Sequence, residues 1–286
     1  MPAGSHPDRS TTPVSYEARD GVSVITLTRP SVLNALDTGL AAALVDAVER
    51  AETDDTYAIV VRGAGRAFCS GMDRNALARG DIGESFYRLW IRALNRLEDA
   101  AKVSIAVLHG YSIGGGLQLA VACDLRLATT DAVVGLGASR HGIIPDGSVL
   151  RLARLIGLAR AKELSLLNDE ITGVAAHAIG LVTRVCAATE LDATLAGMLE
   201  RLRHQAPTAN AHIKRLLHES FHTDPRARID DVLTAQAGCM QSWETAEANR
   251  AWHDRREPVF HPRQQPAPAS SGRPEPAPAS NRPPAS

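Results

Sequence analysis

Two glycine-containing turns carry the residue types best suited to chemistry in this chain. The first has the sequence Ala67-Phe68-Cys69-Ser70-Gly71-Met72-Asp73, and the second contains Tyr111-Ser112-Ile113-Gly114-Gly115-Gly116-Leu117-Gln118. Glycine has no side chain to shield the backbone, so the N–H groups of such turns can point into a shared cavity. Fixed amide dipoles of this kind stabilise an oxygen atom that gains negative charge during a reaction. We therefore interpret the two turns as the two halves of an oxyanion hole.

Each turn follows a segment that predicts a buried strand. Residues 56–62 contain Ile59-Val60-Val61 before the first turn, and residues 103–108 form a second apolar run before the other turn. Short apolar runs rich in β-branched residues are typical of buried strands. The residues after Gly116 have helical spacing, so the second turn would hold its amides at a helix N-terminus. The helix dipole would add to the stabilisation of negative charge there.

The alternation of strand, turn and helix continues along the chain and predicts an α/β domain. Asp20-Gly21 predicts a hairpin turn, and Asp37 predicts a helix N-cap. Residues 75–83 are small and polar and predict a loop. From Ser148 onward the pattern is mostly helical, with helices expected at residues 191–204, 207–219, 227–239 and 242–254.

The chain divides into four predicted regions. Residues 14–200 form the α/β core, and residues 201–260 form a C-terminal helical region. Residues 1–13 are a polar tail, and residues 261–286 are a tail of mainly Pro, Ala and Ser. Both tails have too few apolar side chains to build a core, so we expect them to be disordered.

Composition excludes several classes of partner. The 286 residues are 44% hydrophobic and 22% charged, with a formal net charge of −1. Electrostatic attraction therefore favours neither nucleic acid nor an anionic membrane as a partner. No apolar run approaches the roughly 20 residues that a membrane-spanning helix needs. The polar N-terminus lacks the pattern of a signal peptide, so we expect a cytoplasmic protein.

The four cysteines are widely scattered and have no zinc-ligand spacing, so no metal site is expected. Cys69 lies in the first turn, where it could be read as a nucleophile. No histidine or acid is placed close to it in sequence to activate it, so we favour a buried, reduced thiol.

Six segments, in this order and at this spacing, resemble the crotonase superfamily, the enoyl-CoA hydratase/isomerase family. The resemblance covers about residues 14–260. The matching segments are Asn34-Ala35-Leu36, Ala67-Phe68-Cys69-Ser70-Gly71-Met72-Asp73, Gly110-Tyr111-Ser112-Ile113-Gly114-Gly115-Gly116-Leu117, Cys123-Asp124-Leu125-Arg126, Gly142-Ile143-Ile144-Pro145-Asp146-Gly147 and Ala176-His177-Ala178-Ile179-Gly180-Leu181-Val182.

The resemblance implies a spiral of ββα units followed by helices that pack between subunits of a homotrimer or a hexamer. It implies an acyl-CoA substrate, as in fatty acid metabolism, with coenzyme A as part of the substrate and no separate cofactor. The backbone N–H groups of Met72 and Gly115 would bind the thioester oxygen. The substrate-binding residues implied in this way are Ser70, Gly71, Met72, Asp73, Tyr111, Ser112, Ile113, Gly114, Gly115 and Gln118.

The sequence departs from the family pattern where a hydratase carries two glutamates. Gln118 and Ala138 occupy those positions, and neither side chain can exchange a proton near neutral pH. One acid, Asp146, remains at a motif position. A double-bond shift needs only one base, and burial beside an acyl chain would raise an aspartate pKa toward the working range. The sequence therefore favours isomerisation with Asp146 as the base.

Several alternatives stay open at this point. Asp146 could cap the helix that begins near Ser148, and His141 could be a pocket-wall or surface histidine rather than a proton carrier. The protein could be a non-catalytic acyl-CoA-binding or scaffold protein, or an enzyme of another crotonase reaction type, such as hydration or thioester hydrolysis. By position, Tyr87 and Trp90 are expected to line the acyl pocket.

Overall fold

The computed structural model describes residues 12–221 and 224–260. The predicted tails lie outside these residues, apart from Thr12 and Pro13. A six-stranded sheet has the order β1-β2-β3-β4-β6-β9, and a three-stranded sheet has the order β5-β7-β8. The strands are β1 (Val14–Arg19), β2 (Val22–Leu27), β3 (Ala58–Gly63), β4 (Val103–Leu108), β5 (Tyr111–Ile113), β6 (Leu125–Thr129), β7 (Val133–Gly135), β8 (Ile171–Thr172) and β9 (Arg184–Cys186).

Helices follow or separate most of these strands. They are α1 (Thr38–Thr53), α2 (Arg74–Ala78), α3 (Glu84–Asp99), α4 (Gly115–Ala122), α5 (Ser148–Lys162), α6 (Gly173–Ala178), α7 (Leu191–Arg203), α8 (Pro207–Glu219), α9 (Ile229–Met240) and α10 (Trp243–Asp254). The α/β spiral and the run of C-terminal helices that the sequence predicts are both confirmed.

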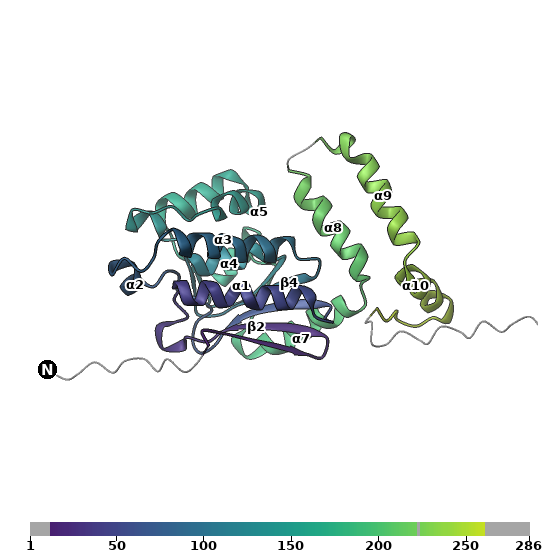
Figure 1. Cartoon of the computed structure of the whole chain (residues 1–286), viewed down its shortest axis with the longest axis horizontal. Helices are drawn as coiled ribbons and strands as arrows, with labels where there is room; N and C mark the ends of the chain where they lie inside the picture. Colours follow the sequence, from purple (N-terminus) through teal and green to yellow (C-terminus); the bar gives the residue numbers. More distant parts are fainter. Residues whose placement is uncertain (1–11, 222–223, 261–286) are drawn as a thin grey trace, which may run out of the picture.

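The larger sheet is covered on both faces, as its continuous apolar strands require. Successive side chains of a strand point to opposite faces. Ile59 and Val61 therefore join the core cluster beneath α1 and α3. Val60 points the other way, into a second cluster that Leu195 of α7 completes. Figure 1 shows α1 and α3 on one side of the sheet and α7 on the other.

Parallel pairing brings the two glycine turns together. β3 and β4 are parallel neighbours, so the turns that follow them leave the sheet at the same edge. An isolated bridge joins Cys69 of the first turn to Ser112 of the second. A second bridge joins Leu36 to Met72. The segments that carry the predicted site therefore meet at one edge of the larger sheet.

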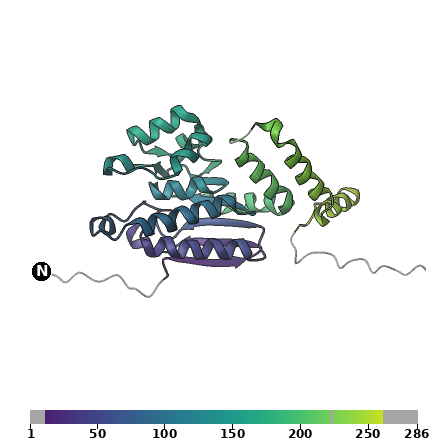
Figure 2. The ribbon, with the colours of Figure 1, turned by 45° about the horizontal axis from the view of Figure 1, so that its top comes forward.

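The C-terminal helices extend away from this core. Figures 1 and 2 show α9 and α10 beyond α8, at the end of the molecule opposite α2. Lys214 of α8 pairs with Asp124 of the core at 2.8 Å, and this ion pair ties α8 to the core. Exposed apolar side chains on α8 and α9 include Leu217, Leu233 and Met240. Assembly into a trimer or hexamer and the boundary at residue 200 remain predictions.

The loop expected at residues 75–83 is wrong in part, because residues 74–78 form the short helix α2. The side chain of Asp73 caps this helix by accepting hydrogen bonds from the N–H groups of Asn75 and Ala76. Burial of Ala76 holds the helix on the core. None of the helices in the described part of the chain is long and apolar enough to cross a membrane.

Candidate active site

Asn34 holds the first glycine turn in place. This side chain is fully buried, and its backbone has a positive φ of 55°, which asparagine tolerates better than most residues. Its Nδ2 donates to the carbonyl oxygens of Ala64 at 3.0 Å, Ala67 at 2.9 Å and Phe68 at 3.2 Å. Its Oδ1 accepts from the N–H of Arg29 at 2.9 Å. One side chain thus satisfies four backbone groups around the turn.

We expect Asn34→Asp to destabilise the protein by about 2–4 kcal/mol, because a carboxylate cannot donate to the three carbonyl oxygens and would repel them. Urea unfolding measures the difference. Asn75→Asp, at an exposed position in the first turn of α2, is the matched control and should cost almost nothing. A cost below about 0.5 kcal/mol at residue 34 would mean that the turn forms without this side chain.

The two glycine turns contact each other through their backbones. Gly71 has a φ of 89°, which suits glycine and leaves no side chain between the turns. A Cβ atom at Gly71 would lie 2.8 Å from the carbonyl oxygen of Ile113 and 3.5 Å from the backbone nitrogen of Gly115. The backbone near Met72 and the start of α4 are therefore close neighbours.

Two backbone N–H groups at this contact have no partner among the described residues. In the bridge to Leu36, the first turn uses the carbonyl oxygen of Gly71 and the N–H of Asp73, each at 2.8 Å. The N–H of Met72, between them, is left free. Gly115 is the first residue of α4, so its N–H has no helical acceptor. These are the two donors that the resemblance implies for the thioester oxygen.

A cavity of about 340 Å³ opens beside these donors. Its wall includes most of the predicted site residues, namely Ser70, Gly71, Met72, Ile113, Gly114, Gly115, Gln118 and Asp146. Tyr87 and Trp90 of α3 also line it, as expected from their positions. The cavity joins the first turn, the start of α4, one face of α3 and the segment before α5.

Asp146 is the only carboxylate in this wall among the described residues. It does not cap α5, because the N-cap is Gly147 and no side chain caps the helix. Burial raises the pKa of Asp146 above its ordinary value of 3.8. The pKa of Tyr87 is also raised, first by burial and second by the negative charge of Asp146. The carboxyl group is thus half-buried beside a tyrosine and free for a substrate.

The two positions that would carry hydratase glutamates both line the cavity. Gln118 is 5% exposed, and its Oε1 accepts a hydrogen bond from Nε1 of Trp90 at 2.9 Å. Ala138 is buried and begins a short 3₁₀ helix, so it presents only a methyl group. His141, at the end of that helix, is exposed and lies at the cavity wall. The structure therefore has no pair of acids for activating water at these positions.

Three predicted substrate-binding residues lie outside the cavity wall. Asp73 caps α2 and pairs with Arg29 at 3.3 Å. Ser112 is fully buried, and Tyr111 is 45% exposed on the outside. Because side chains alternate along an extended segment, Ile113 reaches the cavity while Ser112 points into the core. These three residues therefore lie around the turns and do not line the cavity.

The thiol of Cys69 is fully buried, and burial raises its pKa to about 12. Its Sγ accepts a hydrogen bond from the N–H of Gly71 at 3.5 Å. A thiol with such a pKa is almost wholly protonated at neutral pH and is a poor nucleophile. This agrees with the expectation that Cys69 is a buried thiol and not a nucleophile.

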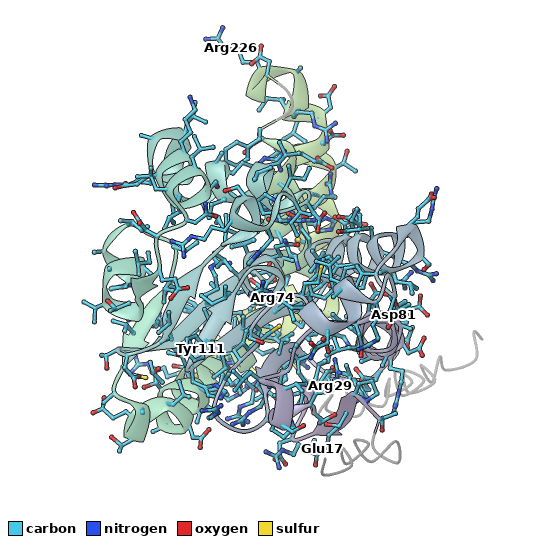
Figure 3. The ribbon with its side chains drawn as sticks, turned by 90° about the vertical axis from the view of Figure 1, so that its left-hand side faces the viewer. Glu17, Arg29, Arg74, Asp81, Tyr111 and Arg226 are labelled. Atoms are coloured by element: carbon cyan, nitrogen blue, oxygen red, sulfur yellow. The ribbon has the colours of Figure 1, made fainter. Side chains whose placement is uncertain are left out.

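Sequence reasoning missed two arginines near the site. Arg74 lines the cavity at the start of α2, and Figure 3 shows it at the same end of the molecule as Arg29. Arg29 pairs with Asp37, the N-cap of α1, at 2.9 Å and with Asp73, the N-cap of α2. The position of Arg74 directly after the first glycine turn is the sequence feature that could have identified it. Nothing in the local sequence connects Arg29 with Asp73, which lies 44 residues further on.

Known proteins share this arrangement of elements. The family model for enoyl-CoA hydratase/isomerase matches residues 17–263. The chain is 34% identical over 251 residues to the human enoyl-CoA hydratase domain-containing protein 2, mitochondrial, covering 84% of this chain and 85% of the relative. It is 31% identical over 251 residues to the peroxisomal Delta(3,5)-Delta(2,4)-dienoyl-CoA isomerase of Arabidopsis thaliana, covering 82% of this chain and 90% of the relative.

Solved structures agree with the sequence relatives. Pseudomonas aeruginosa AtuE is 32% identical, with a TM-score of 0.82, covering 87% of this chain and 99% of that chain. An enoyl-CoA hydratase/isomerase from Marinobacter aquaeolei is 33% identical, with a TM-score of 0.80 and the same coverage. With its paired glycine turns and these relatives, the chain belongs to the enoyl-CoA hydratase/isomerase family of the crotonase superfamily.

Proposed function

We propose that this protein is an acyl-CoA isomerase that moves the double bond of an enoyl-CoA, with Asp146 as its base. The proposal rests on one observation. Asp146 is the only carboxylate among the described residues that line the cavity beside the unpaired N–H groups of Met72 and Gly115. A relative named as a dienoyl-CoA isomerase agrees with this reaction class. The chemistry needs one base and one oxyanion hole, the roles proposed for Asp146 and for the N–H groups of Met72 and Gly115.

The proposed reaction uses these groups in two steps. The thioester oxygen of a 3-enoyl-CoA accepts hydrogen bonds from the N–H groups of Met72 and Gly115. Asp146 removes a proton from C2, and the electron pair of that C–H bond delocalises through the thioester as an enolate. The protonated Asp146 then delivers the proton to C4, while the double bond forms between C2 and C3. The proton returns to the substrate, so no other reactant is consumed.

Hydration fits this cavity less well. It requires groups that orient a water molecule and transfer its protons to the substrate. Gln118 cannot exchange a proton near neutral pH, and Ala138 has no polar atom. Oligomeric assembly as a homotrimer or hexamer and a cytoplasmic location remain part of the proposal.

Purified protein mixed with a 3-enoyl-CoA tests the proposal, with crotonyl-CoA as a parallel substrate. Ultraviolet absorbance and mass spectrometry follow the products. Conversion of the 3-enoyl ester into the conjugated 2-enoyl ester, at constant mass, supports isomerisation. Rapid addition of water to crotonyl-CoA contradicts it, because acids outside the motif positions would then be at work. Tight binding of the esters without turnover indicates a binding or scaffold protein.

We expect the kcat/KM for isomerisation to fall on the acidic side as pH drops through the raised pKa of Asp146. Only the ionised carboxylate can accept the proton, and burial moves its titration above the ordinary value of 3.8. A pH–rate profile measures the midpoint of this limb.

His141 also lines the cavity, so the acidic limb has to be assigned to one of the two side chains. The variant His141→Gln assigns the acidic limb. If the limb keeps its position in this variant, it belongs to Asp146. If the limb disappears, the imidazole is the base and the proposed role of Asp146 is wrong.

A further inference from the structure

The orientation of Gln118 is fixed by a neighbour that can only donate. The indole N–H of Trp90 is a donor and never an acceptor, so the atom of Gln118 that faces it must be Oε1. Trp90 is 1% exposed and stacks on Phe86 with the two ring planes 9° apart. The indole is therefore held in place, and it holds the amide in turn.

The other end of the amide is an unused donor. The Nε2 of Gln118 makes no hydrogen bond with any described residue, although the residue is 5% exposed and lines the cavity. When a bound molecule shuts such a donor off from water, the donor must find an acceptor on that molecule, because leaving it unpaired is costly. Because Oε1 points to Trp90, the group that Gln118 offers to the cavity is its N–H donor. An oxygen atom of a bound molecule would complete the pairing.

The position of Gln118 relative to the oxyanion donors limits where that oxygen can be. Gln118 lies three residues after Gly115 on α4, and its own N–H donates to the carbonyl oxygen of Gly114 at 3.0 Å. Residues three apart on a helix are surface neighbours, with Cβ atoms about 5–6 Å apart. The side chain of Gln118 therefore leaves α4 about one helical turn from the N–H of Gly115 and reaches the same cavity, so we infer that its amide faces the acyl chain.

Charge limits the kind of oxygen. Asp146 brings a carboxylate to the same cavity, and a second anion close to it would be repelled. The amide of Gln118 is neutral, and Arg74 of the same wall is exposed at the start of α2, where solvent and salt screen its charge. A neutral carbonyl or hydroxyl oxygen satisfies the donor without this repulsion.

We propose that the protein selects acyl-CoA thioesters that carry a neutral oxygen, a carbonyl or a hydroxyl, on C5 of the acyl chain, because C3 and C4 form the double bond of the proposed 3-enoyl substrate. Gln118 is the residue that recognises this oxygen, and Trp90 is the positioning residue that turns the amide. The proposal rests on the proposed function, since it names the substrate class of the same acyl-CoA site.

Calorimetric titration at pH 7 with three pairs of CoA esters tests this. The pairs are acetoacetyl-CoA with butyryl-CoA, 4-oxopentanoyl-CoA with pentanoyl-CoA, and 5-oxohexanoyl-CoA with hexanoyl-CoA. Within the pair of 5-oxohexanoyl-CoA and hexanoyl-CoA, the oxo ester should bind roughly 3- to 10-fold more tightly, as expected for one added hydrogen bond. The other two pairs are position controls and should show a smaller preference. In Gln118→Glu an oxygen still accepts from Trp90, but the donor is replaced by a second oxygen. The preference should disappear or reverse.

Gln118→Met is the second variant, in case a carboxylate is not tolerated at this buried position. It should bring the ratio of the two Kd values within each pair close to one. Equal weakening of the oxo and plain esters by Gln118→Met would overturn the proposal, because the amide would then bind the thioester oxygen itself. Equal affinities of 5-oxohexanoyl-CoA and hexanoyl-CoA for the unchanged protein would also overturn it. Failure of all six esters to bind would reject the proposed function as well.

Discussion

Asp146→Asn is expected to lower the kcat/KM for conversion of a 3-enoyl-CoA by roughly 10²- to 10⁴-fold, the usual contribution of a general base. The amide has the size of the carboxylate but cannot accept the C2 proton. The N–H groups of Met72 and Gly115, the proposed oxyanion hole, are unchanged in this variant, so binding of a saturated acyl-CoA should change only a few-fold. Turnover and a separate binding titration with butyryl-CoA measure the two effects.

The fold should tolerate this substitution. Asp146 has a φ of 43°, a conformation that asparagine also adopts readily. Burial raises the pKa of Asp146 in the folded state, so the folded protein holds that proton more tightly than the unfolded chain. Stability from this group therefore increases as pH falls through the folded pKa, and the ionised form is a net cost at neutral pH. The neutral amide removes that cost, so the thermal unfolding midpoint should stay or rise slightly.

A matched control uses an aspartate remote from the cavity. Asp131 lies exposed in the turn between β6 and β7, and Asp131→Asn should leave turnover unchanged. If Asp146→Asn keeps more than about a third of the original kcat/KM, the base is another group. A large loss of activity together with a lower unfolding midpoint would instead indicate a structural role for the carboxylate.

The sequence was most informative where function depends on local backbone geometry. A β-branched strand followed by glycines at residues 71 and 114–116 is a local pattern, and the structure places both turns at one edge of the sheet. The single acid Asp146 was also recognisable, because its segment keeps the spacing of a family motif. Only the structure shows that Asp146 does not cap α5, since a side chain before a helix can cap it or turn away.

Contacts between distant residues could not be predicted in the same way. Trp90 and Gln118 lie 28 residues apart on separate helices, and only their packing makes one the hydrogen-bond donor of the other. The short helix α2 was predicted as a loop, because its stability depends on the Asp73 cap and on burial of Ala76 against the core. The role of Arg29 could not be predicted, because its partners Asp37 and Asp73 lie close together only in the folded protein.

Gly116→Ala is expected to destabilise the protein by about 1–3 kcal/mol and to lower isomerase turnover by at least 100-fold. A Cβ atom at Gly116 would lie 2.2 Å from the carbonyl oxygen of Cys69 and 2.9 Å from its Cβ. The carbonyl belongs to the backbone and accepts from the N–H of Ile113 at 3.0 Å, so it cannot move without breaking the contact between the turns. Separating the turns would displace the donor of Met72 from that of Gly115. Thermal unfolding and the isomerase assay measure the two losses.

Variants at two other glycines show whether the loss at Gly116 comes from this clash or from adding a methyl group in general. Gly197 is exposed within α7 with no atom near its Cβ position, so Gly197→Ala should keep full turnover and gain up to about 1 kcal/mol from helix propensity. At Gly115 the added Cβ would meet Cδ1 of Leu36 at 2.1 Å, the end of a flexible side chain that can rotate. Gly115→Ala should therefore destabilise the protein less than Gly116→Ala. Equal stability for the variants at residues 115 and 116 would show that the backbone contact with Cys69 does not hold the turns together.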